Sequence, residues 1–244
     1  KGDSAKYQAG IFIDVNFYQK KVDRSLVADL FPTSRGARSP LNNKERAQDI
    51  GRRLMLETGP LVGMIQIPGI RYGVKDVITL ATLNSAIERE LTLLDENGID
   101  TLELQTDFFA SCLSAWLEAS GRFEDPKKKK GVSDINPQNV VYQGRILVSI
   151  ITLIPAMLSE LKKKNLEFFS EDAKTYMIKW LQKTAIRAGL LKDNIFIGKD
   201  EFKALGYLGS GGIGRFRDLL WAASNTTKDL SKLEEEKIAE IANN

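Results

Sequence analysis

The sequence predicts a mainly α chain with a smaller α+β part at its beginning. Apolar residues recur at helical spacing through most of the chain after residue 76. Segments that favour strands are few and short, and most of them lie before residue 75. Capping residues and Gly or Pro stops separate the helical segments. We therefore expect most of the strands, together with a basic loop and helix, within residues 1–75, and a helical domain over residues 76–244.

The composition excludes several kinds of active site. The 244 residues include no histidine, which excludes a Ser-His-Asp triad, an imidazole base and histidine metal ligands within this chain. The single cysteine, Cys112, lies on an apolar stripe, and one cysteine cannot build a cysteine zinc site. The net charge is only +3, so binding to nucleic acid has to rest on local clusters of cations. We expect a cytoplasmic chain with no metal site and no membrane contact.

The first part opens with a strand, a short helix and a loop. Residues 11–15 alternate in the manner of a strand, and residues 20–30 carry apolar side chains at helical spacing up to Pro32. The chain begins almost directly before that strand, and we expect it to be a section of a longer protein. Residues 33–40 form a loop rich in Arg, Ser and Pro.

A capped helix follows the loop. Asn42 with Glu45 three residues later resembles a capping box, which predicts that a helix begins there. Its buried face should comprise Ala47, Ile50 and Leu54. Its outer face should carry Lys44, Gln48, Arg52 and Arg53. The apolar segment 64–67 that comes next fits either an extended stretch or a loop.

Helices dominate the rest of the chain. A stripe over residues 80–94 predicts a helix that Asn97-Gly98 ends in the left-handed conformation. Asp100 with Glu103 should open the next helix, whose buried stripe is Phe109, Cys112, Leu113 and Trp116. Ser170 should cap a helix that ends at Gly189, followed by a short strand at 194–197, a short helix at 200–205 and a helix through Trp221.

Residues 146–158 are the most apolar segment and predict a buried central helix. Pro155 should bend this helix. Lys162, Lys163 and Lys164 should lie in its last turn, where cations suit the carbonyl end of a helix. The segment has 13 residues and is too short to cross a bilayer, which needs about 20.

The strongest candidate site is a cluster of cations between residues 33 and 53, with six cations against two anions. Arginine can donate two hydrogen bonds to one phosphate, and a loop before a helix N-terminus offers backbone N–H groups. The alternative is a solvated helix face with local ion pairs, such as Asp49 with Arg53. The candidate phosphate- or DNA-binding residues are Asn16, Arg35, Arg38, Arg46, Arg52 and Arg53.

A run of lysines offers a second basic segment. Lys127, Lys128, Lys129 and Lys130 lie in the stretch 122–136, which has the composition of a disordered loop. Such a run is either a solvated loop or a non-specific contact with a polyphosphate backbone, and the second interpretation implies strong salt dependence. We include the four lysines among the candidate DNA-binding residues.

Residues 209–214 match the pattern G-x-G-x-x-G. A dinucleotide site needs a preceding strand in a parallel sheet, whereas residues 202–207 are helical in character. We expect a turn that positions a helix N-terminus, and a helix-turn-helix is the alternative. Gly211, Gly212 and Arg215 are the candidates for a secondary anion site.

The stretch 11–16, followed by Lys20-Lys21-Val22 and Ser25-Leu26, resembles the region just after the signature motif of DGQHR-domain proteins. This family includes DndB-like proteins associated with DNA sulfur modification. The stretch 35–42 and Arg52-Arg53 add to the resemblance, which is clearest over residues 9–60. It implies that residues 1–75 are the end of a ParB/sulfiredoxin-like α/β portion. The Asp-Gly-Gln-His-Arg signature is absent, so under this resemblance it lies upstream of Lys1.

The resemblance and the cation cluster together predict a DNA-binding, regulatory protein of a bacterial DNA-modification system of the phosphorothioation type. Contact with the phosphate backbone through the arginine-rich loop and helix would position the protein without reading sequence. One alternative is a ParB/sulfiredoxin-like enzyme that hydrolyses a nucleotide with Mg²⁺. Another is a helical scaffold of a modification complex. We assign no catalytic residue and no cofactor, and the expected partners are DNA and other DNA-modification proteins.

Overall fold

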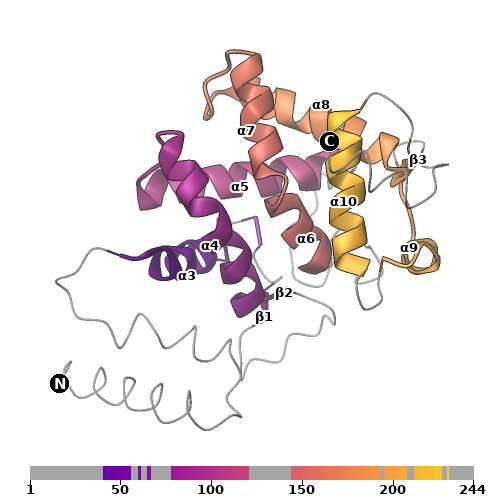
Figure 1. Cartoon of the computed structure of the whole chain (residues 1–244), viewed down its shortest axis with the longest axis horizontal. Coiled ribbons are helices and arrows are strands. Elements are labelled where there is room, and N and C mark those ends of the chain that lie inside the picture. Colours follow the sequence, from indigo (N-terminus) through magenta and orange to yellow (C-terminus); the bar gives the residue numbers. More distant parts are fainter. Residues whose placement is uncertain are drawn as a thin grey trace, which may run out of the picture. The chain divides into compact units, whose positions relative to one another are not determined.

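The computed structural model describes residues 41–55, 60–61, 65–66, 78–120, 144–192, 195–207, 212–226 and 230. These residues are mostly helical, which confirms the predicted mainly α class (Figure 1). The chain divides into two compact units, and the main division falls between Thr106 and Asp107. The expected segments at 11–15, 20–30, 33–40 and 122–136 lie outside the described residues.

The first unit is built on a pair of helices. It contains α3 (Asn43–Leu54), β1 (Ile65–Gln66), β2 (Ile78–Thr79) and α4 (Leu80–Glu96). β1 pairs in parallel with β2, with Ile65 opposite Ile78. α4 begins beyond residue 75, the boundary expected from the sequence, yet it packs along α3.

The start of α3 confirms the predicted capping box. The Asn42 side chain accepts a hydrogen bond from the Glu45 backbone N–H at 2.9 Å, and the Glu45 carboxylate accepts one from the Asn42 backbone N–H at 2.9 Å. Ala47, Ile50 and Leu54 are buried as predicted. The placement of Gln48 on the outer face is wrong, because its side chain is only 3% exposed. The face that α3 buries is thus wider than the apolar stripe in its sequence.

Gly51 lets α3 and α4 approach closely. A Cβ atom at this position would meet the Asn84 side chain and would lie 3.2 Å from the Leu80 side chain. Asn84 is buried, and with its amide oriented to match its neighbours its nitrogen donates to the carbonyl oxygens of Leu80 and Ala47, each at 3.2 Å. A polar side chain thus links the two helices inside an otherwise apolar contact.

The turn between α4 and α5 (Leu102–Ala119) differs in one detail from the expectation. Gly98 has φ +75°, which confirms the predicted left-handed end of α4. The cap of α5 is Thr101 and not Asp100, since the Thr101 hydroxyl accepts a hydrogen bond from the Leu104 backbone N–H at 3.2 Å. The predicted stripe of α5 is buried as expected.

The second unit contains the later part of α5 and the helices that follow it. Their bounds are α6 (Gly144–Ile151), α7 (Ile154–Lys163), α8 (Glu171–Arg187), α9 (Lys199–Ala204) and α10 (Gly212–Asn225). A short hairpin of β3 (Leu191–Lys192) and β4 (Ile195–Phe196) follows α8. α10 packs against both α6 and α8, and α7 packs against α8.

The apolar segment 146–158 is two helices and not one bent helix. The break comes before Pro155, at Thr152 and Leu153, where the Thr152 hydroxyl donates to the Ser149 carbonyl oxygen at 2.7 Å. Pro155 then lies in the first turn of α7, where a missing backbone N–H costs no helical hydrogen bond. Lys162 and Lys163 lie in the last turn of α7, as predicted.

The start and end of α8 match the sequence. The Ser170 hydroxyl accepts a hydrogen bond from the Ala173 backbone N–H at 3.1 Å, which confirms the predicted cap. Gly189 has φ +69° just beyond the helix. Met177, Leu181 and Ala185 form its buried side.

A Gly51→Ala substitution should destabilise the chain by about 1–3 kcal/mol, because the added methyl group overpacks the contact with Asn84 and Leu80. Urea unfolding followed by circular dichroism measures the change. Gly214→Ala in α10 is the matched control, since a Cβ there meets nothing within 4 Å. It should be neutral or stabilising by up to about 1 kcal/mol. Equal effects of the two substitutions would contradict this view of Gly51.

Candidate functional site

Only some of the candidate site residues lie in the part of the chain that the structure describes. Arg46, Arg52 and Arg53 all lie on α3. Gly212 and Arg215 lie on α10. The remaining candidates lie outside the described residues and stay predictions: Asn16, Arg35, Arg38, Lys127, Lys128, Lys129, Lys130 and Gly211.

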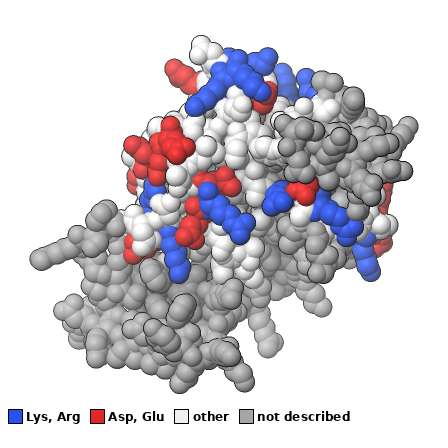
Figure 2. All heavy atoms as spheres, viewed as in Figure 1, with Lys and Arg blue, Asp and Glu red and all other residues white. Residues whose placement is uncertain are grey.

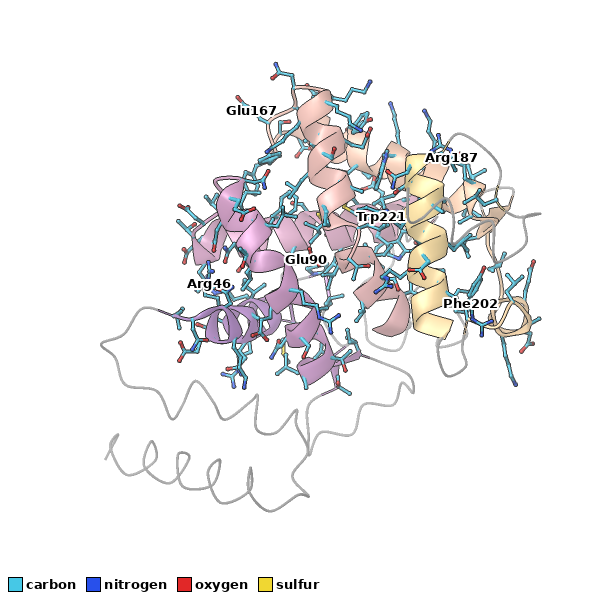
Figure 3. The ribbon with its side chains drawn as sticks, viewed as in Figure 1. Arg46, Glu90, Glu167, Arg187, Phe202 and Trp221 are labelled. Atoms are coloured by element: carbon cyan, nitrogen blue, oxygen red, sulfur yellow. The ribbon has the colours of Figure 1, made fainter. Side chains whose placement is uncertain are left out.

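Arg46 points toward the end of α4, where it forms a two-point contact with Asp95 (Figure 3). Its Nη1 and Nη2 atoms donate to Oδ1 and Oδ2 of Asp95, each at 2.7 Å. Nη2 also donates to the Asn43 side-chain oxygen at 2.6 Å. The Arg46 side chain is only 15% exposed. The guanidinium group is therefore occupied inside the first unit.

The Arg46–Asp95 pair shifts both side chains toward their charged forms. The hydrogen bond from Arg46 is the main cause that lowers the pKa of Asp95, and it outweighs the opposite effect of partial burial. The same hydrogen bond raises the pKa of Arg46. Two-point pairs of this kind are stronger than ordinary hydrogen bonds, because both partners are charged and their geometry is matched. The pair accordingly anchors α3 to α4.

Gln105 adds a third element to this network. Its Nε2 atom donates to Asp95 Oδ1 at 2.8 Å and to the Ile99 carbonyl oxygen at 3.0 Å. Its side chain is fully buried. Sequence reasoning missed both Asp95 and Gln105. The one available signal was a polar side chain on the apolar stripe of α5, one turn before Phe108 and Phe109.

Arg53, unlike Arg46, lies at the surface of the first unit. Its side chain is 41% exposed, and its Nη1 atom lies 3.4 Å from Oε1 of Glu103, which is itself 70% exposed. Such a long, solvent-exposed ion pair is worth about 0–1 kcal/mol. Arg52 precedes Arg53 in the last turn of α3 and is half-buried. Arg53 is thus the candidate arginine on α3 that solvent and a ligand can reach.

Gly212 and Arg215 come together at the turn after α9. The Arg215 Nη2 atom donates to the Gly206 carbonyl oxygen at 3.3 Å. A Cβ on Gly212 would lie 2.6 Å from that oxygen and 2.5 Å from the carbonyl oxygen of Tyr207, so this close approach requires glycine. The ring centroids of Phe202 and Phe216 lie 5.1 Å apart beneath the turn. These contacts account for both residues as parts of a packed turn.

Glu90 is a titratable group that the sequence did not single out. It lies on α4, labelled in Figure 3, at the edge of the apolar stripe and three residues after Ile87. Burial raises the pKa of its carboxyl to about 7, against the smaller opposing effect of the positive charge on Arg89. The folded chain therefore holds a proton on Glu90 at pH values where an exposed glutamate is ionised.

Two further properties bound the kinds of site present. In the described ranges, no group of three or more His, Cys, Asp or Glu side chains could hold a metal ion. None of the helices there combines the length and apolar character that crossing a membrane requires. The Cys112 thiol is buried in an apolar setting that raises its pKa, so it is an inert core residue.

Comparison with known proteins adds no assignment. The sequence matches no model of a known protein family, and no curated protein and no solved structure is significantly similar to it.

An Arg46→Ala substitution should destabilise the chain by about 2–3 kcal/mol, because it leaves the Asp95 carboxylate partly buried without its main partner. A double-mutant cycle with Asp95→Ala, measured by urea unfolding, should give a coupling free energy above about 1 kcal/mol. The matched control is Arg53→Ala, which should change stability by less than about 0.5 kcal/mol. Additive effects of Arg46→Ala and Asp95→Ala would contradict the structural role of the pair.

The raised pKa of Glu90 predicts how stability depends on pH. The unfolded chain releases this proton near its ordinary pKa of 4.5, and the folded chain releases it only near 7. The free energy of unfolding should therefore fall as the pH rises between these values and should then level off. Glu90→Gln should remove this fall and should raise stability at pH 8 by about 1 kcal/mol, after solvent screening of a partly exposed group.

Thermal unfolding at several pH values measures this effect. Glu96→Gln on the exposed side of α4 makes the same charge change and is the control. An equal response of the two variants would show that Glu90 is not the group responsible.

Proposed function

We propose that this chain is a DNA-binding, regulatory protein of a bacterial DNA-modification system of the phosphorothioation type. The resemblance over residues 9–60 supports the kind of system. The charge of the candidate residues supports contact with the phosphate backbone. Its partners in the cytoplasm would be DNA and other proteins of the same system.

The proposal rests mainly on Arg53, whose side chain is exposed and only weakly paired. Its guanidinium group lies at the end of α3 and forms a long, exposed ion pair with Glu103. A DNA phosphate offers two or more oxygens to the same donors and can replace Glu103 at little cost. Binding would also release counterions from the DNA, which favours the complex at low salt.

Arg46 takes a supporting role in this proposal. Because its donors are directed to Asp95 and Asn43, it positions α3 and does not contact DNA. Arg35 and Arg38, in the segment before α3, remain proposed DNA contacts on the basis of the sequence.

Fluorescence anisotropy with duplex DNA over a salt series tests the proposal. Arg53→Glu should weaken binding several-fold at low salt and should reduce the slope of log K against log salt by about one. Arg217→Glu is the matched control, since Arg217 is also exposed and forms an ion pair, with Asp218 at 3.0 Å.

Arg35→Ala and Arg38→Ala test the part of the proposal that rests on sequence. Each should lower the slope while leaving the free energy of unfolding unchanged. A wild-type chain that does not bind duplex DNA even at low salt would contradict the proposed function. Equal effects of Arg53→Glu and Arg217→Glu would remove Arg53 from the contact.

A further inference from the structure

A second basic surface lies on the second unit, at lysines that the sequence analysis did not assign to a site. We call it the α7–α8 lysine face and define it by Lys162, Lys164, Lys179 and Lys183, all of which are exposed. Figure 2 shows a group of Lys and Arg side chains at the upper edge of the view, with acidic side chains beside it. None of these four lysines forms an ion pair with another described residue.

The charges of α8 are separated along the helix, with the anions in its first turn and only cations after it. Its acidic residues, Glu171 and Asp172, lie in the first turn, where they suit the N-terminus of the helix. From Ala173 to Arg187 the helix carries four cations and no anion. Lys179 and Lys183 are one turn apart, so their like charges repel each other within α8. A polyanion at this face would relieve that repulsion.

The Glu160 carboxylate on α7 is paired with partners of its own, whereas Glu167, in the connection between α7 and α8, is exposed. Glu160 accepts hydrogen bonds from Lys163 Nζ at 2.8 Å and from the Tyr176 hydroxyl at 3.0 Å. These hydrogen bonds, the one from Lys163 first, lower the pKa of the Glu160 carboxyl. The contact with Tyr176 also joins α7 to α8, which pack against each other. The Glu160 charge is therefore not available to offset Lys179 and Lys183.

We infer that the α7–α8 lysine face is a second contact with the phosphate backbone of a nucleic-acid duplex, an inference that rests on the proposed function. The outward side of α8 favours this partner over a membrane. It presents polar side chains, including Thr175, Lys179, Gln182 and Lys183, and Ile186 is its one large exposed apolar residue. A helix that lies on a bilayer needs a broad face of bulky apolar residues instead.

Anisotropy with duplex DNA over a salt series tests the inference on the complete chain. The double substitution Lys179→Glu with Lys183→Glu should weaken binding at least about tenfold at low salt and should reduce the salt slope by about two. The matched control is Lys174→Glu with Lys203→Glu, which makes the same charge change at two exposed lysines outside the face. Circular dichroism should show that both variants keep the wild-type helical content.

The outcomes separate the two proposals. If wild type binds DNA and the two double variants behave alike, the lysine face is not a contact, while the proposed function stands. If wild type binds vesicles containing anionic phospholipid and does not bind DNA, both proposals are wrong. A loss of affinity confined to the Lys179 and Lys183 variant supports the lysine face, whatever the result for Arg53→Glu.

Discussion

The Asp95 carboxylate holds the first compact unit together, because three elements meet at its two oxygens. It accepts two hydrogen bonds from Arg46 on α3 and one from Gln105 on α5, while it belongs to the end of α4 itself. The side chains of Arg46 and Asp95 are 15% and 35% exposed. Partly buried charges of this kind are stable only in pairs, so the carboxylate determines how α3 sits on α4.

Because of this ion pair, the arginines Arg46 and Arg53 of α3 lie in different environments, one inside the unit and one at its surface. Arg46 is directed inward by Asp95, and the close contact of Gly51 with Asn84 fixes the rotation of the same helix. With that rotation, Arg53 in the last turn projects toward solvent beside Glu103. The second unit shows a similar division, since Glu160 pairs with Lys163 while Lys179 and Lys183 are exposed and form no ion pair with another residue of the described ranges. Only exposed cations can reach the phosphates of a bound DNA duplex.

Much of the fold could be predicted from local sequence patterns. The caps at Asn42 and Ser170 and the left-handed end at Gly98 depend on residues within four positions of one another, and all three are confirmed. The errors have tertiary or fine local causes. Gln48 is polar, yet the breadth of the α3–α4 contact buries it. The break before Pro155 comes at Thr152 and Leu153, where the Thr152 hydroxyl bonds back to Ser149, and the spacing of apolar residues does not reveal it.

The sequence could not predict which arginines of the candidate site are exposed, because this depends on partners far away in the chain. Arg46 and Arg53 are equivalent in a sequence pattern, since each is a cation near other cations on one helix. What separates them is Asp95, which lies 49 residues after Arg46, and Glu103, which lies 50 residues after Arg53. No local rule relates partners at that distance. Lys162 and Lys164 of the α7–α8 lysine face were not taken as a site because lysines at a helix end have a sufficient local explanation in the helix dipole. Lys179 and Lys183 lie in the body of α8, and the sequence does not show which residues of other elements lie near them.

Some cations of this chain form ion pairs within the fold, such as Arg46 with Asp95. Other cations, which are exposed, bind the DNA phosphates in our proposal. Side-chain NMR of the ¹⁵N-labelled chain during titration with duplex DNA tests it most directly. The account predicts that the Arg53 Nε–H signal and the Lys179 and Lys183 ammonium signals shift in a salt-dependent way, while the Arg46 signal stays in place. A shift of Arg46 as large as that of Arg53, or DNA binding that leaves Arg53 and both lysines unchanged, would contradict it.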